Sequence, residues 1–285
     1  MSELFWPGDQ RAGQLLTDAA LVAAMTRVEV AWLRALHAAG VAPDVDPGAV
    51  GPVAVADLAG DVEAGGNPVI PLVRVLREGL PEATARWLHR GLTSQDVLDS
   101  ALLLCVRDAL DRVLGDAQRQ VAALRRLADR HRNSVQAGRT LTQFAVPTTF
   151  GRTAANWLAG VLDAAADVAE ARDRLPLQLG GAAGTQAAII ALGGDPEALG
   201  AAVAGELRLA PAPPWHTNRR PVTRIGDALV SCVDAFGRIA NDVLLRSRPE
   251  IGELSEPAPG GSSTMPGKQN PILSVLIKRA AIAAP

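Results

Sequence analysis

The stretch "DSALLLCVRDALDRVLGDAQRQVAALRRLADRHRN", residues 99–133, decides the fold of this protein. Its apolar positions recur at alternating three- and four-residue steps: Leu103, Val106, Leu110, Val113, Ala117, Val121 and Leu124. This spacing lines one side of a long helix with a narrow apolar seam, as in a packed bundle. Because one compact globule cannot cover a helix of this length, the stretch predicts that several long helices lie side by side.

Two later segments repeat the pattern. Residues 151–174 and 221–250 are each expected to form a long helix. One stripe of the second segment is apolar and is formed by Ile225, Leu229, Cys232, Phe236, Ile239 and Val243. Aromatic residues make up only 3% of the chain and tyrosine is absent, so the composition also favours helices over sheets. Together these observations predict an all-α fold built as a bundle of long helices.

The N-terminal part is expected to be a small helical domain over residues 1–98. Residues 17–40 carry a helical pattern that begins at Thr17 or Asp18 as N-cap and stops at Gly40. Prolines interrupt the remainder of this domain, which favours short helices joined by loops.

The bundle domain is expected over residues 99–285. A last helix should begin near Pro271 with Asn270 as its N-cap, since proline suits the first turn of a helix. The chain stops about four turns later, so we expect that this helix is cut short, that a C-terminal domain is absent and that the intact gene encodes more. The narrow seams favour a bundle completed by helices of other subunits, with a monomeric helical protein as the alternative.

Charge and composition exclude several classes of protein. The formal net charge is −2 and no basic block is present, so the electrostatic footprint of a nucleic-acid binder is missing. No stretch approaches the roughly 20 apolar residues of a membrane span, and the N-terminus does not resemble a signal peptide. Cys105 and Cys232 stand within apolar helical patterns, which favours buried thiols over a disulfide or a metal site. We therefore expect a cytoplasmic protein that binds neither nucleic acid nor membrane.

Two of the connectors between these helices favour packing. "GNPVIPLV", residues 66–73, is expected to be a loop followed by a short apolar helix. "LQLGGAAGTQAA", residues 177–188, lacks the spacing of a nucleotide-binding loop, and its glycines favour a close approach of backbones.

A third connector, "LHRGLTSQDVLDS" at residues 88–100, concentrates donors and acceptors just before the long helix. The hydroxyls of Thr93 and Ser94, together with the helix N-terminus, can hold a carboxylate. Capping of the helix by Asp96 or Ser94 is the simpler alternative, but a cap explains one residue of the cluster and not all of it.

A fourth connector, "AGRTLTQFAVPTTFG", covers residues 137–151. Arg139 offers a forked donor that suits a carboxylate, and Thr140 and Gln143 can orient it. Taken alone, this string indicates an anion site only weakly.

The segment "GGSSTMPGKQNP", residues 260–271, is the most polar interruption of the chain. Ser262 and Ser263 provide hydroxyls and Lys268 provides a cation, just before the start of the last helix. A serine alkoxide favoured by a lysine and backbone N–H groups could take a proton from a carbon next to a carboxylate. Such a loop would have to close over its substrate and exclude water, which the two glycines permit. A disordered linker is the alternative.

The segment "GSSTMPGKQNP" is similar to the signature of the fumarase, aspartase and argininosuccinate lyase superfamily. "GLTSQDVLD" and "GRTLTQFAVPTTFG" fall where its other two motifs should be, so three ordered motifs span much of the chain. The start "SELFWPGDQRAGQLLTD", the segments "GGNPVIPLV" and "LQLGGAAGTQAA", and "PWHTNR" at residues 214–219 most resemble the 3-carboxy-cis,cis-muconate cycloisomerases of that superfamily.

The resemblance implies a homotetramer in which each active site is built from three subunits and no cofactor or metal is used. It assigns Ser262 as the base, with Lys268 and Asn270 as groups that bind a substrate carboxylate. The remaining residues that the resemblance assigns to substrate binding are His89, Thr93, Ser94, Arg139, Thr140, Gln143, Ser263 and Met265. Arg219 is an added candidate for binding a small polycarboxylate substrate, with a charge pair at the start of the following helix as the alternative.

The reaction implied by the resemblance is a reversible lactonisation of a triacid in protocatechuate breakdown, the β-ketoadipate pathway. Another lyase of the superfamily, of the adenylosuccinate or substituted-succinate type, and a catalytically silent helical assembly module are the alternatives. The chain departs from the superfamily pattern at two positions, because Leu141 replaces a histidine and Val275 replaces a glutamate. These departures leave the general acid of the reaction open.

Overall fold

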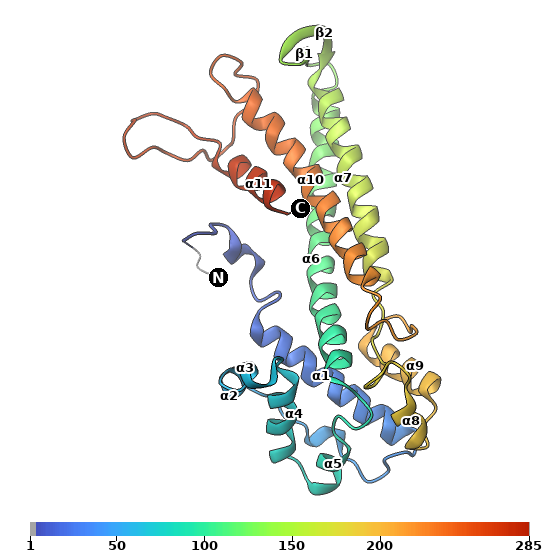
Figure 1. Cartoon of the computed structure of the whole chain (residues 1–285). Helices are drawn as coiled ribbons and strands as arrows, with labels where there is room; N and C mark the ends of the chain where they lie inside the picture. Colours follow the sequence, from blue (N-terminus) through green and yellow to red (C-terminus); the bar gives the residue numbers. More distant parts are fainter. Residues whose placement is uncertain (1–3, 285) are drawn as a thin grey trace. The chain divides into compact units, whose positions relative to one another are not determined.

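The computed structural model describes residues 4–284. These residues form helices and one two-stranded antiparallel sheet, which Figure 1 shows in chain order. The elements are η1 (Asp9–Ala12), α1 (Asp18–Ala38), η2 (Pro47–Ala49), α2 (Ala56–Ala59), α3 (Val62–Gly65), α4 (Val69–Glu78), α5 (Glu82–Trp87), α6 (Ser94–Arg130), β1 (Val135–Thr140), β2 (Gln143–Thr149), α7 (Phe150–Asp173), α8 (Ala187–Ala191), α9 (Pro196–Leu207), α10 (Arg220–Arg246) and α11 (Ile272–Ala283). The all-α prediction is confirmed, and the three predicted long helices are α6, α7 and α10.

The chain divides into two compact units. Among the described residues, unit 1 comprises 4–12, 112–171 and 224–284, and unit 2 comprises 13–111 and 172–223. Each unit is described by itself below. The domain boundary that the sequence predicts at residue 98 stays a prediction. Within residues 4–284, no helix combines the length and apolar character needed to cross a membrane.

Unit 2 is built around α1, whose apolar face forms the centre of its core. Met25, Trp32 and Leu33 are fully buried, and α1 packs against α9. The hydroxyl oxygen of Thr17 accepts a hydrogen bond from the N–H of Ala20, and Gly40 follows the helix with a φ of +71°. The predicted cap and stop of this helix are therefore confirmed, because an accepting side chain starts it and a residue free to adopt positive φ ends it.

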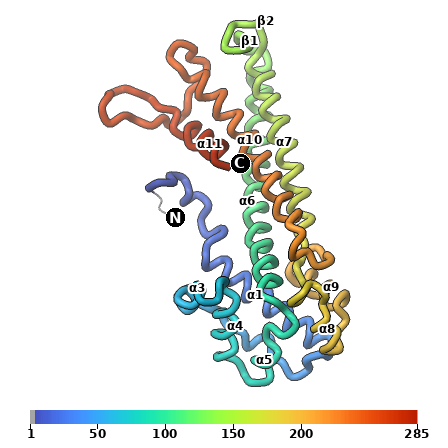
Figure 2. The backbone as a smooth tube through the Cα atoms, in the orientation of Figure 1, coloured from blue at the N-terminus to red at the C-terminus, as the bar shows by residue number. Residues whose placement is uncertain are grey.

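Unit 1 is built around α7, α10 and the C-terminal part of α6, which run beside one another in Figures 1 and 2. Gly151 allows α7 to start against α6, because a Cβ there would lie 2.6 Å from the carbonyl oxygen of Ala128. The indole N–H of Trp157 on α7 donates to the carboxylate of Asp242 on α10 at 2.8 Å. Backbone proximity and a buried aromatic residue thus hold these helices together.

Apolar surface on unit 1 is left uncovered. A cavity of about 450 Å³ lies between α6, α10 and α11, and Leu124, Phe236 and Ile277 are among the residues that line it. On α11, Ile272, Leu273, Val275, Ile277 and Ile282 are between 40% and 71% exposed. The prediction that helices of other subunits cover these faces stays a prediction.

Both cysteines are free and buried, as the sequence predicts. Burial raises the pKa of the Cys105 thiol and also that of the Cys232 thiol above the ordinary value. Neither thiol lies at a position that the sequence assigns to chemistry.

The β-hairpin formed by β1 and β2 was not predicted. Its two-residue turn is Leu141 and Thr142, which adopt φ values of +47° and +67°. Turns of this kind favour asparagine and glycine, so the sequence carries no ordinary hairpin signal at this point. Gly138 interrupts the register as a bulge, and Pro147 pairs on the edge strand where its missing N–H is tolerated. The connector predicted as a polar loop is therefore a hairpin.

Candidate active site

The connector before α6 is fixed by Asp96, a carboxylate that is 1% exposed. Its oxygens accept five hydrogen bonds of 2.8–3.2 Å, from the backbone N–H groups of Thr93, Gly180 and Gly181, the side-chain amide of Gln178 and Nε2 of His216. Because a buried carboxylate must have its oxygens satisfied, this cluster ties the start of α6 to the glycine-rich loop of residues 177–186. The bond from Thr93 also extends α6 beyond its predicted start at residue 99.

Glycines make this cluster sterically possible. A Cβ on Gly180 would lie 2.6 Å from Cε1 of His216, and a Cβ on Gly181 would lie 3.2 Å from the carbonyl oxygen of Gly91. Gly181 also has a φ of +70°. The close backbone approach predicted for this loop is therefore confirmed.

His89 belongs to the same connector and pairs with a buried acid. Its Nδ1 lies 2.6 Å from Oε1 of Glu29, and the Glu29 side chain is fully buried on α1. His89 has a φ of +61°, an uncommon value for a residue other than glycine. The indole N–H of Trp32 donates to the carbonyl oxygen of the adjacent Arg90 at 2.9 Å. Because a carboxylate oxygen accepts the hydrogen bond of an imidazole N–H, the contact with Glu29 favours a proton on Nδ1 of His89.

The other predicted residues of unit 2 lie near the start of α6. Thr93 and Ser94 are half-buried there, and their role in substrate binding stays a prediction. Arg219 forms two hydrogen bonds of 2.7 and 2.9 Å with the carboxylate of Asp99, and its guanidinium lies over the ring of Trp215. Hydrogen bonding to Asp99 raises the pKa of Arg219 above its ordinary value. Arg219 is thus already engaged by a carboxylate of its own unit.

In unit 1, Arg139 lies on β1 and is engaged in the same way. Its guanidinium donates two hydrogen bonds of 3.0 and 2.7 Å to the oxygens of Glu253. Hydrogen bonding from Arg139 lowers the pKa of Glu253, with burial acting in the opposite direction. Thr140 and Gln143 pair across the end of the hairpin and are exposed. The hairpin therefore presents polar groups at its tip, while Arg139, one residue before Thr140, is held by Glu253.

The segment predicted as a catalytic loop is closed at its neck, and Figure 2 traces it between α10 and α11. Gly260 and Asn270 exchange two backbone hydrogen bonds of 2.8 Å, and the side-chain amide of Asn270 donates to the carbonyl oxygen of Gly261 at 2.9 Å. Gly260 is required at the neck, because a Cβ there would overlap the side chain of Ile272. The alternative of a disordered linker does not account for this neck.

Inside the loop, the hydroxyl of Ser262 accepts hydrogen bonds from the N–H groups of Met265 at 3.0 Å and Thr264 at 3.3 Å. Two backbone donors on one hydroxyl oxygen favour negative charge on that oxygen. The three other predicted residues of the loop, Ser263, Met265 and Lys268, are exposed. Their exposure leaves them accessible to a substrate.

The start of α11 corrects one prediction. Helix α11 begins at Ile272, close to its predicted start, but Asn270 does not cap it. Instead, the carboxylate of Glu256 accepts hydrogen bonds from the N–H of Ser274 at 2.7 Å, the Ser274 hydroxyl at 2.6 Å and the N–H of Leu273 at 3.2 Å. The side chain of Asn270 is directed back to the neck, so a more distant acid caps the helix.

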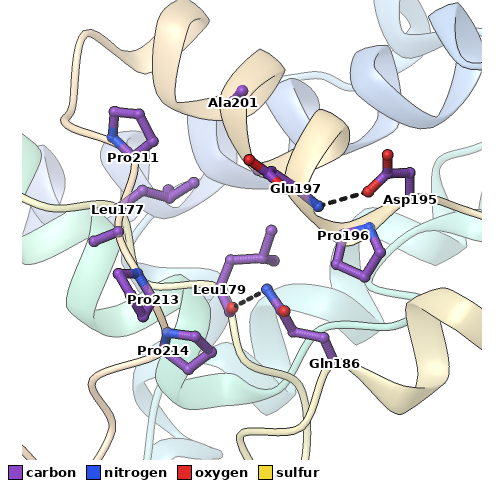
Figure 3. A pocket seen from close by; sticks show the side chains of 12 residues that line it. Leu177, Leu179, Gln186, Asp195, Pro196, Glu197, Ala201, Pro211, Pro213 and Pro214 are labelled. Atoms are coloured by element: carbon purple, nitrogen blue, oxygen red, sulfur yellow. Dashed lines mark hydrogen bonds between the residues drawn. The ribbon is translucent and has the colours of Figure 1, made fainter.

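A cavity of about 510 Å³ in unit 2 lies apart from the predicted site residues (Figure 3). Its apolar lining includes Leu177, Leu179, Pro211, Pro213 and Pro214, and its acidic lining residues are Asp195 and Glu197. The carboxylate of Asp195 caps α9, and Gln186 donates to the carbonyl oxygen of Leu179. Two acids and no basic side chain among the lining residues make this cavity a poor site for a polycarboxylate.

The predicted site residues fall into two groups. His89, Thr93, Ser94 and Arg219 belong to unit 2, and all others belong to unit 1. Sequence reasoning missed the acids that hold them, namely Glu29, Asp99, Glu253 and Glu256. Glu29 carried a usable signal, because it stands in the apolar stripe of α1 between buried Val28 and Ala31. Glu253 and Glu256 lie in a polar stretch, and Asp99 stands at the predicted start of the long helix, where an acid is ordinary, so no sequence signal marks these three as structural.

A bundle of long helices with three polar connectors, the last of which is the closed serine loop, is typical of the fumarase and aspartase superfamily. The model of a family described as lyase matches residues 58–284, and the chain belongs to this family. The match covers all three connectors.

Similar proteins with names come from several bacteria. The chain is 41% identical to nitrosuccinate lyase of Streptomyces davaonensis, over 95% of this chain and 61% of that protein. It is 39% identical to 3-carboxy-cis,cis-muconate cycloisomerase of Bradyrhizobium diazoefficiens, over 92% of this chain and 60% of that protein. The crystal structure of 3-carboxy-cis,cis-muconate lactonizing enzyme from Pseudomonas putida matches with a TM-score of 0.89 at 31% identity, over 100% of this chain and 66% of that chain. The chain thus spans about 61% of the length of the first of these relatives.

Proposed function

We propose that this protein is a 3-carboxy-cis,cis-muconate cycloisomerase, which interconverts the triacid and a carboxymuconolactone. The observation that supports the chemistry is the Ser262 hydroxyl, which receives two backbone N–H donors inside a closed loop. Relatives and solved structures with this activity in their names support the choice of substrate.

In the proposed reaction, a carboxylate oxygen of the triacid forms a bond to an alkene carbon. The neighbouring carbon, which lies next to another carboxylate, then takes the proton of the Ser262 hydroxyl. In the reverse direction the Ser262 alkoxide removes that proton, the carbon–oxygen bond breaks and the carboxylate leaves. Negative charge builds up on the carboxylate next to the reacting carbon in both directions.

The roles of the other residues follow from that charge. Lys268 and Asn270 are proposed to bind the carboxylate on which charge develops, because they belong to the loop that carries Ser262. Ser263, Met265, Thr140 and Gln143 are proposed to line the substrate, as are His89, Thr93 and Ser94 of unit 2. Arg219 stays a secondary candidate, because a substrate would have to compete with Asp99 for its guanidinium.

A second candidate is β-elimination from nitrosuccinate, which the 41% identity to nitrosuccinate lyase favours. The base would remove the proton next to one carboxylate while the carbon–nitrogen bond breaks and nitrite leaves. The same serine and carboxylate-binding groups would serve this reaction. A carboxylate leaves in the reverse lactonisation and nitrite leaves in the elimination. Both are stable anions, so neither reaction requires a strong general acid. This agrees with the exposed Leu141 and Val275 at the positions of the superfamily's histidine and glutamate.

The test measures turnover of 3-carboxymuconate, nitrosuccinate and adenylosuccinate in parallel by ultraviolet absorbance, with nitrite release measured for the second. Wild type is compared with Ser262→Ala and with Ser231→Ala, an exposed serine on α10 that serves as the control. We expect diene absorbance to fall with wild type and with the control. The rate of this loss should be lower by about 10³-fold or more in Ser262→Ala. Undiminished turnover in Ser262→Ala would remove the serine from the mechanism, and turnover of nitrosuccinate alone would establish the second candidate.

A further inference from the structure

Two glutamates three residues apart stand just before the serine loop and bind two different elements of unit 1. Glu253 binds Arg139 on the hairpin through both carboxylate oxygens, and Arg246 at the end of α10 approaches the same carboxylate at 3.3 Å. Glu256 binds the first turn of α11. The short segment between α10 and the loop is therefore attached at both of its acids.

The contacts of Glu253 leave little of Arg139 for another ligand. The side chains of Arg139, Glu253 and Arg246 are 14%, 23% and 14% exposed. Both terminal nitrogens of Arg139 donate to Glu253, and its guanidinium lies 5.7 Å from the centre of the Phe144 ring. A substrate carboxylate would have to break two charge-assisted hydrogen bonds to reach this guanidinium.

A further residue joins this group to the hairpin. Arg246 also donates to the side-chain oxygen of Gln136, and the Gln136 amide donates to the hydroxyl of Thr153 at 2.6 Å. The base of β1, the start of α7 and the end of α10 thus meet at Glu253. This connected set of partners is typical of a structural junction and differs from an open anion site, whose donors would lack protein partners.

The contacts of Glu256 hold the other side of the loop's base. Glu256 holds Ser274, which is 6% exposed, and the backbone bonds between Gly260 and Asn270 close the neck between these two points. The loop residues 261–269 lie beyond the neck, and the hydrogen bonds of Ser262 and Ser263 are made within the loop. The position of the Ser262 hydroxyl is therefore set by where the base of the loop is held.

We propose that Glu253 and Glu256 anchor the base of the serine loop, and that Arg139 is a positioning residue that acts through Glu253 and does not bind the substrate. This inference rests on the proposed function for the role of Ser262, and it replaces the role that the sequence resemblance gave to Arg139. In the folded protein, these two anchors fix the orientation of the Ser262 hydroxyl before the substrate reacts.

A double-mutant cycle separates positioning from binding. Arg139→Ala and Glu253→Ala are each expected to lower kcat about 10- to 100-fold while KM changes less than about threefold, because misplacing a reacting group by about 1 Å has effects of this size. The double variant should be no worse than either single variant, since both remove the same contact. Two results together would overturn the proposal: a large rise in KM confined to Arg139→Ala, and a loss of kcat in the double variant equal to the product of the two single losses.

A second measurement does not depend on turnover. Amide hydrogen exchange of Gly260 and Asn270 is expected to rise at least about tenfold in Glu253→Gln and Glu256→Gln, because loss of an anchor lets the neck open more often. Glu250, an exposed glutamate between the end of α10 and Glu253, provides the matched control. Glu250→Gln should leave the exchange rates of both amides unchanged. The glutamine variants keep the side-chain shape, so they are the ones to use if an alanine variant does not fold.

The two failures are distinguishable. If no tested substrate is turned over while exchange rises as expected, the anchor stands and the proposed function fails. If wild type turns over a substrate while exchange at Gly260 and Asn270 is the same in all three glutamine variants, the anchor proposal fails and the proposed function is untouched.

Discussion

Oε1 of Glu29 lies 2.6 Å from Nδ1 of His89, while the other carboxylate oxygen of Glu29 is buried without a hydrogen-bond partner among the described residues. Burying an acid with a single hydrogen-bond partner costs folding free energy, so the Glu29–His89 pair is expected to serve a structural or functional purpose. The pair favours a proton on Nδ1 of His89 and leaves Nε2 outside this contact. This arrangement gives His89 a defined hydrogen-bonding atom in the connector that precedes α6.

Glu29→Gln should change the tautomer of His89. In wild type, nitrogen-15 NMR of the imidazoles should show a proton on Nδ1 of His89, because an ionised carboxylate accepts its hydrogen bond. The chain has four histidines, so the signals can be assigned with single substitutions. His37→Asn removes an exposed histidine from α1, the helix that carries Glu29, and should leave the His89 signal unchanged. A wild-type His89 with its proton only on Nε2 would contradict the prediction.

Asp96→Asn should destabilise unit 2 strongly. Five donors converge on the carboxylate of Asp96, and an asparagine offers one oxygen and turns a donor toward the others. The unfolding free energy in urea should fall by about 2–4 kcal/mol, since buried N–H groups lose their acceptor. Asp57→Asn, an exposed position on α2, should change it by less than about 0.5 kcal/mol. Equal stability of Asp96→Asn and wild type would refute the assigned role of this cluster.

Two glycine substitutions should have opposite effects. Gly180→Ala places a methyl group 2.6 Å from Cε1 of His216 and should lower the unfolding free energy by about 1–3 kcal/mol. Gly205→Ala on α9 meets open space within a helix and should raise the unfolding free energy by about 0.5–1 kcal/mol. Thermal unfolding followed by circular dichroism measures both. A stabilising Gly180→Ala would mean that His216 can move away without loss.

The stability supplied by Glu253 should depend on pH. Hydrogen bonds from Arg139 lower the pKa of Glu253 in the folded protein, so its carboxylate releases protons more readily than in the unfolded chain. The resulting stabilisation is present above the ordinary glutamate pKa and is lost as the pH falls through the lowered folded value. Wild type should therefore exceed Glu253→Gln in unfolding free energy at pH 6 to 7, and the difference should shrink toward zero in acid. A difference that grows in acid would have the wrong sign.

Self-association should depend on the uncovered apolar faces of unit 1. We expect sedimentation of the native protein at four times the mass of one chain. Ile282→Asp, at a side chain that is 71% exposed on α11, should shift this equilibrium to smaller species, because it places a charge in an apolar interface. Ile190→Asp, at 61% exposure on α8 of unit 2, is the matched control and should leave the mass unchanged. A monomeric wild type would contradict the predicted tetramer.

Periodicity predicted the helices because it follows directly from burial. The seam from Leu103 to Leu124 belongs to α6, and Thr17 and Gly40 bound the first helix as expected. The start of α6 was placed five residues late, because the bond from the Thr93 N–H to Asp96 extends the helix into a polar stretch that carries no apolar pattern.

The hairpin escaped prediction for a different reason. Its turn residues, Leu141 and Thr142, hold positive φ values that these side chains seldom adopt. Local sequence preference is therefore overridden by tertiary contacts of the strands, such as the pair of Arg139 with Glu253. No local signal in the sequence could have shown this.

The sequence by itself determined the helical class, the family signature and the chemistry-bearing residue types, because burial periodicity and motif spacing are local properties of the chain. Only the tertiary structure decided which acids hold those residues. Glu29, Glu253 and Glu256 are the same residue type, yet Glu29 pairs with His89, Glu253 binds Arg139 and Glu256 caps α11. The partner of a charged side chain depends on which segments fold against each other, and that pairing is set by the packing of the whole unit.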